Sequence, residues 1–343
     1  MVRGCSSTKR RVGAALCGGS RRPSSRPADL RRRSAGDLFF PPGHAVAALP
    51  HTGAVRFRHH GPDTRLRGLV QGFWELEDAQ LAWPEQNYSL PERTLRLMFS
   101  AETLRLGPSL AELRPLPPVV LTPFTRQPHR TVGQGRLRML VAELYPWAAR
   151  QLLGWTADTP PDALDAALSA SPWGREVVGL VRSGEWTAAR EALEGHLLAL
   201  GHLRDGPGTG VLAAQRIYGS FGAARVADLA EELGVSPRTL ERQFVREVGV
   251  SAKTLARVVR FDEANTRIRS DPAVPMADLT FELGFFDQAH LIKEFRALSS
   301  LTPGAFASLA ARRRQRVDLD LLRAAGEQHL DLERLPGFEP DPT

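Results

Sequence analysis

One phrase of the sequence occurs twice. The first copy, VADLAEELGVSPRTLERQF, covers residues 226–244, and the second, MADLTFELGFFDQAHLIKEF, covers residues 276–295. The copies match at an offset of fifty as far as Gly234 and Gly284, after which one extra residue in the second copy makes the offset fifty-one. The repeat predicts two copies of one structural unit.

Each copy has the residue pattern of a helix, a tight turn and a second helix. Leu229 and Leu233 lie four positions apart, on one face of a short helix. Gly234 follows where the backbone must turn, which predicts a positive φ. Ser236, followed by proline, is a favoured N-cap for a second helix, and Asp287 takes this place in the second copy. The pattern predicts two helix-turn-helix units.

Two helix pairs are also compatible with solenoid packing repeats, but solenoids need about three or more repeats to bury a continuous core. Arg238, Arg242 and Arg246 recur every four residues on the second predicted helix of the first copy. Such a stripe is usually a solvated face. In a helix-turn-helix unit, however, the second helix is the one that enters the major groove of DNA, so its position favours DNA binding.

Residues 211–314 resemble the C-terminal DNA-binding domain of AraC-type transcriptional regulators. The resemblance lies in LAEELGVSPRTLERQF in the first unit and ELGFFDQAHLIKEFRALSSLTPGAF in the second. It implies two helix-turn-helix units joined by one long helix. Ser300 departs from the pattern, because it stands where the family usually has glycine, and this puts a phosphate-facing turn in question.

The segment between the copies, SAKTLARVVRFDEANTRIRS, has no internal proline or glycine and predicts an unbroken helix over residues 251–270. About twenty helical residues span roughly 30 Å, and one turn of B-DNA advances about 34 Å. A rod of this length can hold two recognition helices in successive major grooves. A single chain is therefore expected to read two half-sites of a double-stranded DNA operator.

The resemblance also implies which residues contact DNA. Base-edge contacts are expected from four residues of each recognition helix: Arg238, Thr239, Glu241, Arg242, Gln288, Ala289, Ile292 and Lys293. Phosphate contacts are expected from Arg246, Lys253, Arg296 and the helix start at Thr302. The first recognition helix is the more polar of the two and is expected to contribute more to the discrimination between DNA sequences. Residues 208–314 hold fifteen Lys or Arg against twelve Asp or Glu, which predicts a moderate salt dependence.

The predicted fold class is α+β, with a mainly-β sensor or dimerisation domain at residues 51–205 and an all-α DNA-binding domain at 208–314. Four apolar runs separated by turn residues predict a small antiparallel sheet or barrel, at residues 69–76, 95–99, 119–124 and 137–144. Residues 160–200 have helical spacing, and RDGPGTG at 204–210 predicts the domain boundary. A diffuse resemblance to the N-terminal domain of some of these regulators says little about a ligand.

Candidate binding residues in this first domain are few. Histidines and predicted-strand glutamates are candidate metal ligands: His59, His60, His129, Glu75, Glu77 and Glu143. Adjacent strand residues point to opposite faces, so His59 and His60 are not expected to share an ion, and no metal or cofactor is predicted. Four aromatic residues are either core or the lining of an apolar effector pocket: Trp74, Trp83, Tyr145 and Trp147.

The composition bears on the compartment of the protein and on the significance of its net charge. No stretch approaches the roughly 18 apolar residues of a membrane span. The two cysteines, Cys5 and Cys17, support neither a disulfide framework nor a zinc site, so the cytoplasm is the expected compartment. The net charge is +7, but residues 1–36 hold nine Arg and one Lys against one Asp, which leaves the rest of the chain at −2. The total charge is therefore no argument for DNA binding.

Both ends of the chain are expected to lie outside the domains. Residues 1–50 are rich in Arg, Ser, Gly and Pro and predict a disordered basic extension. An organellar transit peptide, a lipoprotein-like signal and a misassigned start codon are alternatives. Residues 315–343 are acidic and poorly periodic, which predicts a loose tail.

These observations predict a sequence-specific transcriptional regulator whose N-terminal domain responds to a small-molecule effector or a partner, with RNA polymerase and a second copy of the chain as further candidate partners. A constitutive regulator, in which that domain only dimerises, fits the sequence too. An enzyme fused to a DNA-binding domain, as in DNA-repair alkyltransferases, fits poorly, because no cysteine occurs after Cys17 to act as nucleophile.

Overall fold

The computed structural model describes residues 55–81, 87–107, 112–122, 129–132, 135–155, 159–201 and 207–312. The predicted extension at 1–50, the predicted tail at 315–343, both cysteines and Trp83 lie outside the described residues. In the part of the chain that is described, none of the helices has the length and apolar character to cross a membrane.

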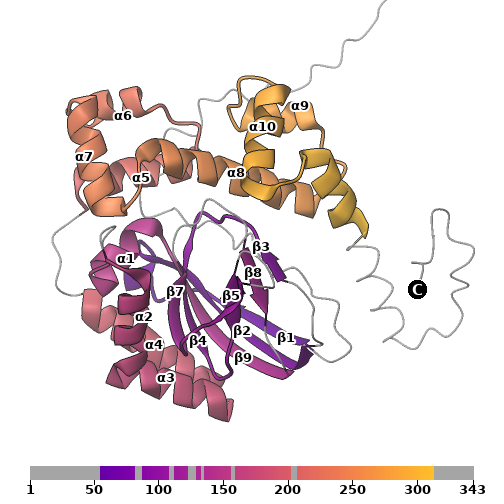
Figure 1. The fold of residues 1–343 in the computed structure, drawn as a ribbon. Helices are drawn as coiled ribbons and strands as arrows, with labels where there is room; N and C mark the ends of the chain where they lie inside the picture. Colours follow the sequence, from indigo (N-terminus) through magenta and orange to yellow (C-terminus); the bar gives the residue numbers. More distant parts are fainter. Residues whose placement is uncertain are drawn as a thin grey trace, which may run out of the picture. The chain divides into compact units, whose positions relative to one another are not determined.

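The first half of the chain forms two antiparallel sheets (Figure 1). The five-stranded sheet has the order β1-β2-β9-β4-β7, and its strands are β1 (Val55–His60), β2 (Val70–Leu81), β9 (Gly135–Leu144), β4 (Leu95–Ser100) and β7 (Val119–Thr122). The four-stranded sheet has the order β3-β8-β5-β6, with β3 (Asn87–Ser89), β8 (His129–Val132), β5 (Arg105–Gly107) and β6 (Arg114–Pro115). The predicted antiparallel strands are confirmed.

The central strands of the five-stranded sheet are buried on both faces. On one face Phe73, Leu97 and Leu140 belong to a core that the helices share. On the other face Trp74 and Val141 belong to a second apolar cluster. Successive strand residues point to opposite faces, so two covered faces explain the nearly continuous apolar runs of these strands.

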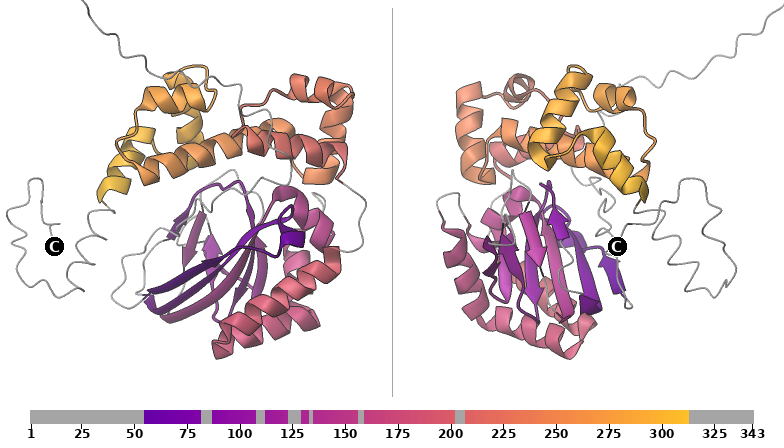
Figure 2. Two further views of the ribbon diagram at one scale, coloured as in Figure 1. Left: turned by 180° about the vertical axis from the view of Figure 1, so that it is seen from behind. Right: turned by 45° about the vertical axis from the view of Figure 1, so that its right-hand side comes forward.

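Four helices follow the last strand and pack beside the sheet (Figure 2). They are α1 (Pro146–Leu153), α2 (Pro161–Ala170), α3 (Pro172–Ser183) and α4 (Trp186–Gly201). Helix α2 covers the edge strand β7, because Asp165 accepts a hydrogen bond from the amide of Leu121 (2.9 Å) and Ser169 accepts one from the amide of Val119 (3.1 Å). These bonds satisfy amides that an open sheet edge would leave unpaired.

The second half of the chain is helical. Its helices are α5 (Thr209–Gly219), α6 (Val226–Glu232), α7 (Pro237–Val248), α8 (Ala252–Ser270), α9 (Met276–Glu282) and α10 (Gln288–Ser299), and residues 303–312 are helical as well. Helix α8 is the predicted rod, unbroken over 19 residues and capped by Ser251, which corresponds to about 28 Å. The predicted all-α arrangement and its long helix are confirmed.

The main hydrophobic core continues across the predicted boundary at 204–210. Tyr218 of α5 meets the rings of Tyr145 and Trp147 edge-on, at centroid distances of 5.4 and 5.3 Å. All three side chains are buried. The core interpretation of Tyr145 and Trp147 is therefore confirmed. Helices α9 and α10 have a separate core around Phe261 and Phe295.

Candidate DNA-binding interface

The first predicted unit consists of α6, a tight turn and α7. Gly234 has φ 66°, in the left-handed region. The amide of Val235 donates to the carbonyl of Ala230 (3.0 Å), which closes the turn over the end of α6. Ser236 then caps α7 by accepting a hydrogen bond from the amide of Thr239 (3.2 Å). The predicted glycine conformation and N-cap are both confirmed.

The second unit, α9, turn and α10, repeats this geometry. Gly284 has φ 67°, and the amide of Phe285 donates to the carbonyl of Thr280 (3.0 Å). Asp287 caps α10 by accepting from the amide of His290 (2.7 Å). The repeated phrase therefore encodes one repeated structure, in which the same positions turn and cap the chain.

The second helix of each unit has one buried and one exposed face. The buried face holds apolar residues, namely Leu240, Phe244 and Val248 in α7 and Leu291, Phe295 and Leu298 in α10. On α7 the arginine stripe lies on the opposite, exposed face. Arg238 and Arg242 make no hydrogen bond or ion pair with any described residue, so their guanidinium groups are available to a ligand.

Arg260, in the middle of α8, connects the segment before the first unit with the turn of the second. Its Nη2 donates to the carbonyl of Gly222, between α5 and α6 (2.9 Å), and its Nη1 donates to the carbonyl of Gly284, in the turn of the second unit (3.3 Å). Its guanidinium also lies over the ring of Phe285, 5.3 Å from the centroid. Near it, Arg257 of α8 pairs with Glu294 of α10. The rod is thereby bonded to the entry of the first unit and to the turn of the second.

Comparison with known proteins identifies this half of the chain. A family model described as a helix-turn-helix domain matches residues 229–308. Residues 229–308 are an AraC-type helix-turn-helix domain. The match runs from α6 to the helix that follows α10, so it includes both units, and the chain is a DNA-binding transcriptional regulator. No curated protein matches the sequence.

Solved structures of ToxT from Vibrio cholerae are similar over most of the chain. A ToxT structure at 1.65 Å resolution is 10% identical, with a TM-score of 0.37, and covers 74% of this chain and 97% of its own. ToxT bound to (E)-4-(8-methylnaphthalen-1-yl)but-3-enoic acid is 10% identical, with a TM-score of 0.40, and covers 74% and 99%. Wild-type ToxT bound to an unsaturated fatty acid is 10% identical, with a TM-score of 0.39, and covers 75% and 95%.

The predicted base-reading residues of the AraC-type domain differ in their surroundings. Arg238 and Arg242 of α7 and Gln288, Ala289 and Lys293 of α10 are exposed, and Ile292 is 44% exposed. Thr239 is half-buried and its hydroxyl lies 2.9 Å from that of Ser236, so it takes part in the cap of α7. Glu241 is half-buried as well.

The predicted phosphate-binding residues lie at the margins of the two units. Lys253 at the start of α8 and Arg296 of α10 are exposed. Arg246 pairs with its neighbour Glu247 at 3.2 Å. Thr302 caps the last helix, because its hydroxyl accepts from the amide of Ala305 (3.2 Å). This hydrogen bond occupies one of the free amides at the helix start to which a phosphate could otherwise bind.

Ser300, the departure from the family pattern, ends α10 in the left-handed conformation with φ 63°. Its amide donates to the carbonyl of Arg296 (2.9 Å), as in a helix ended by glycine. A Cβ atom makes this conformation unfavourable. The turn keeps its shape with serine, at a cost in stability.

Arg93, which sequence reasoning missed, links the sheet region to α8. It lies just before β4 and is 3% exposed. Its Nε is 3.1 Å from Oδ2 of Asp262, and its Nη1 is 3.3 Å from Oε2 of Glu263. Burial opposes the charge of Arg93, but Asp262 and Glu263 outweigh it and raise the pKa of the guanidinium. Local pattern holds no signal for such a pair, because its members are far apart in the chain.

The candidate metal ligands of the sheet region are engaged separately. His59 and His60 stand opposite Trp74 and Phe73 of β2, on different faces of the sheet. His60 pairs with Glu75 at 3.0 Å, and burial lowers the pKa of His59. Among the side chains that the structure describes, no group of three or more His, Cys, Asp or Glu could hold a metal ion.

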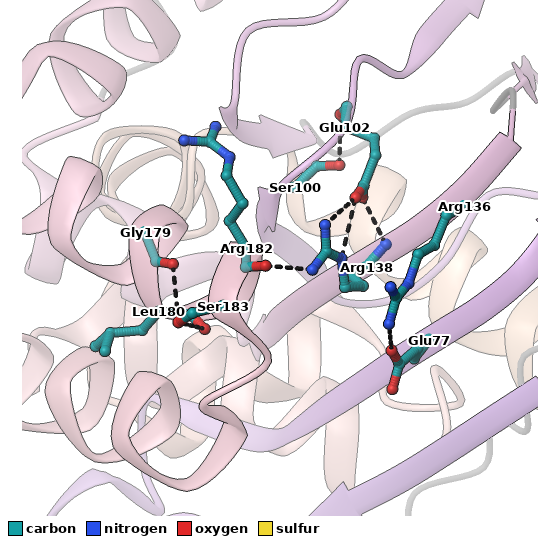
Figure 3. A network of polar contacts seen from close by, with 9 residues as sticks. All are labelled: Glu77, Ser100, Glu102, Arg136, Arg138, Gly179, Leu180, Arg182 and Ser183. Carbon is teal, nitrogen blue, oxygen red and sulfur yellow. Dashed lines mark hydrogen bonds and ion pairs between the residues drawn. The ribbon is translucent and has the colours of Figure 1, made fainter.

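The two remaining glutamates also have protein partners. Glu143 accepts from the indole of Trp74 (3.3 Å), and Glu77 pairs with Arg136 (Figure 3). The side chain of His129 lies outside the described residues. Figure 3 also shows Arg138 of β9, which binds the carboxylate of Glu102 and reaches the carbonyl of Arg182 in α3. The contact of Arg138 with Arg182 joins the sheet to α3.

Proposed function

We propose that one chain reads two half-sites of a double-stranded operator, with α7 in one major groove and α10 in the next. The rod α8 supports this proposal, because its length of about 28 Å approaches the advance of roughly 34 Å per turn of B-DNA. The observation that carries the proposal is the pair of bonds from Arg260 to the carbonyls of Gly222 and Gly284, since they connect the rod to the segment that enters unit one and to the turn of unit two.

The exposed residues of the two reading helices have distinct roles in this proposal. Arg238 and Arg242 of α7 bind guanine edges, Gln288 of α10 binds adenine, and Ala289 and Ile292 contact thymine methyl groups. Thr239, Glu241 and Lys293 complete the two reading faces. Phosphates are bound by Arg246, Lys253, Arg296 and the helix start at Thr302. Unit one supplies more discrimination, because its reading face carries two unpaired guanidinium groups.

The N-terminal domain, residues 51–205, controls the DNA-binding domain, residues 208–314, through an effector or a partner. The buried contacts of Arg93 with Asp262 and Glu263 support this, because a change in the loop before β4 acts directly on the rod. RNA polymerase and a second copy of the chain are further proposed partners, the cytoplasm is the proposed compartment, and no catalytic role is proposed.

Selection from a random-sequence DNA library with the full chain tests the two-groove proposal. The expected motif has two conserved elements, one helical turn of about 10 base pairs apart. Arg238→Ala and Arg242→Ala should each weaken binding by about 1–3 kcal/mol and relax the sequence of the first element. Arg175 is an exposed arginine of α3, and Arg175→Ala is the matched control. It should change neither the affinity nor the selected sequence. A motif with a single element would contradict the proposal.

A further inference from the structure

Phe286 is the extra residue of the second unit. Gly234 and Gly284 adopt the same left-handed conformation. In the first unit, one residue separates this glycine from the cap of the reading helix, Ser236. In the second unit two residues separate it from the cap, Asp287. The additional position is Phe286, so the first unit has no counterpart of this side chain.

The structure holds Phe286 in place and exposes its ring. The ring is 92% exposed, whereas the ring of Phe285 beside it is buried. The amide of Phe286 donates to Nδ1 of His290 (3.3 Å), and the amide of His290 donates to the carboxylate of Asp287 (2.7 Å). These bonds fix the backbone on the helix side of Phe286, so its phenyl group is presented at the first turn of α10.

Phe286 lies immediately before the cap of the reading helix, and two exposed apolar residues lie on the helix itself. These are Ala289 and Ile292, which are three apart and therefore neighbours on the helix surface. Isolated exposed apolar residues are ordinary, but three at the start of a helix proposed to bind a ligand indicate an apolar feature in that ligand.

The charged and polar neighbours of these three apolar side chains favour DNA as their ligand. Lys293 and Arg296 are exposed on the same helix, and the amide of Gln288 lies next to its start. A mixture of cationic, amide and apolar groups suits a groove with phosphates at its rim. The apolar feature of the major groove is the C5 methyl group of thymine, which accepts contact from alanine and phenylalanine side chains.

We propose that Phe286 is a specificity-determining residue that covers the methyl group of a thymine at the edge of the second half-site. This inference rests on the proposed function and extends it, because it assigns a base to a position that is absent from unit one. It also makes unit two a reader of thymine-rich sequence through three exposed apolar side chains, those of Phe286, Ala289 and Ile292.

Thymine-to-uracil scanning tests the contact, because uracil lacks only the methyl group. The full chain first selects its site from a random DNA library, and each thymine of the second element is then replaced by deoxyuridine. Wild-type protein should lose about fourfold in affinity at one or two positions, the factor that corresponds to one buried methyl-sized group. Phe286→Ala should bind the thymine site more weakly and lose this sensitivity at the same positions.

Phe281→Ala is the matched control, since Phe281 is 85% exposed but lies on α9 instead of the reading helix. It should keep the wild-type response to uracil. Thermal unfolding of Phe286→Ala should match the wild type, because the ring has little contact with the protein. If wild type and Phe286→Ala respond identically to every uracil, the inference is wrong. If Arg238→Ala still weakens binding in that case, the proposed function stands. If the wild type selects no sequence, the inference and the proposed function are both wrong.

Discussion

Arg93 and Asp262 form an ion pair from which water is almost completely excluded. Nε of Arg93 lies 3.1 Å from Oδ2 of Asp262, and the two side chains are 4% and 0% exposed. One residue precedes a strand of the sheet region and the other lies in the middle of the rod that joins the two DNA-binding units. Loss of one partner leaves a buried charge without compensation. This pair therefore couples the sheet region directly to the rod.

Arg93→Ala should lower the free energy of unfolding by about 3–5 kcal/mol, because Asp262 then stays buried without its cation. Chemical denaturation measures this change. The double variant Arg93→Ala with Asp262→Ala should lose less than the sum of the two single variants. Arg216→Ala removes a pair that is half exposed and should change little. Additive single losses would show that the pair is not coupled.

Arg260→Ala should weaken binding to an operator with both elements more than binding to DNA with the first element alone. Its guanidinium bonds the segment that enters unit one and the turn of unit two, and hydrogen bonds to charged groups contribute about 1.5–3 kcal/mol each. Fluorescence anisotropy with the two DNA duplexes measures the difference. An equal loss on both duplexes would mean that Arg260 does not set the relation between the units.

Ser300→Gly should stabilise the protein by about 1 kcal/mol, because glycine adopts the left-handed conformation at φ 63° without the steric cost of Cβ. The melting temperature should therefore rise. Ala297 is an exposed position inside α10, and Ala297→Gly is the control. It should lower the free energy of unfolding by about 1 kcal/mol, opposite to the effect of Ser300→Gly. A lower melting temperature for Ser300→Gly would indicate that the serine hydroxyl stabilises this turn.

Asp165 should make the protein less stable as pH rises through 6. Burial raises its pKa from 3.8 to about 6 in the folded state, against a smaller opposing effect of the Leu121 amide. Between these values the folded state binds more protons than the unfolded state, so the free energy of unfolding falls as pH increases. Its contribution is fully present below about pH 4 and is lost above about pH 6.

Asp165→Asn removes this titration and keeps an oxygen for the amide of Leu121. The variant should resemble the wild type below about pH 4 and be more stable by about 1–3 kcal/mol at pH 7.5. Denaturation at both pH values measures the difference. Parallel pH profiles for the two proteins would show that Asp165 is solvated and titrates normally.

The helix-turn-helix units were predictable because their information is local. A glycine, a capping side chain and apolar residues four apart specify each turn and each buried face within about twenty residues. The same holds for β2, β4, β7 and β9, whose apolar runs predicted their positions. Ser300 was marked by the resemblance to the family, and its left-handed conformation explains why glycine is usual there.

Contacts between residues far apart in the sequence could be identified only from the tertiary structure. No periodicity relates Arg93 to Asp262, or Arg260 to the carbonyls of Gly222 and Gly284, because each pair forms only after the helices have packed. Tyr145 and Trp147 had two interpretations in the sequence, and the packing of Tyr218 decided for the core. Helix caps, turns and amphipathic spacing involve only a few neighbouring residues, so the local sequence encodes them. Whether a charge or a ring is buried depends on which surfaces pack together, and this is determined only in the folded chain.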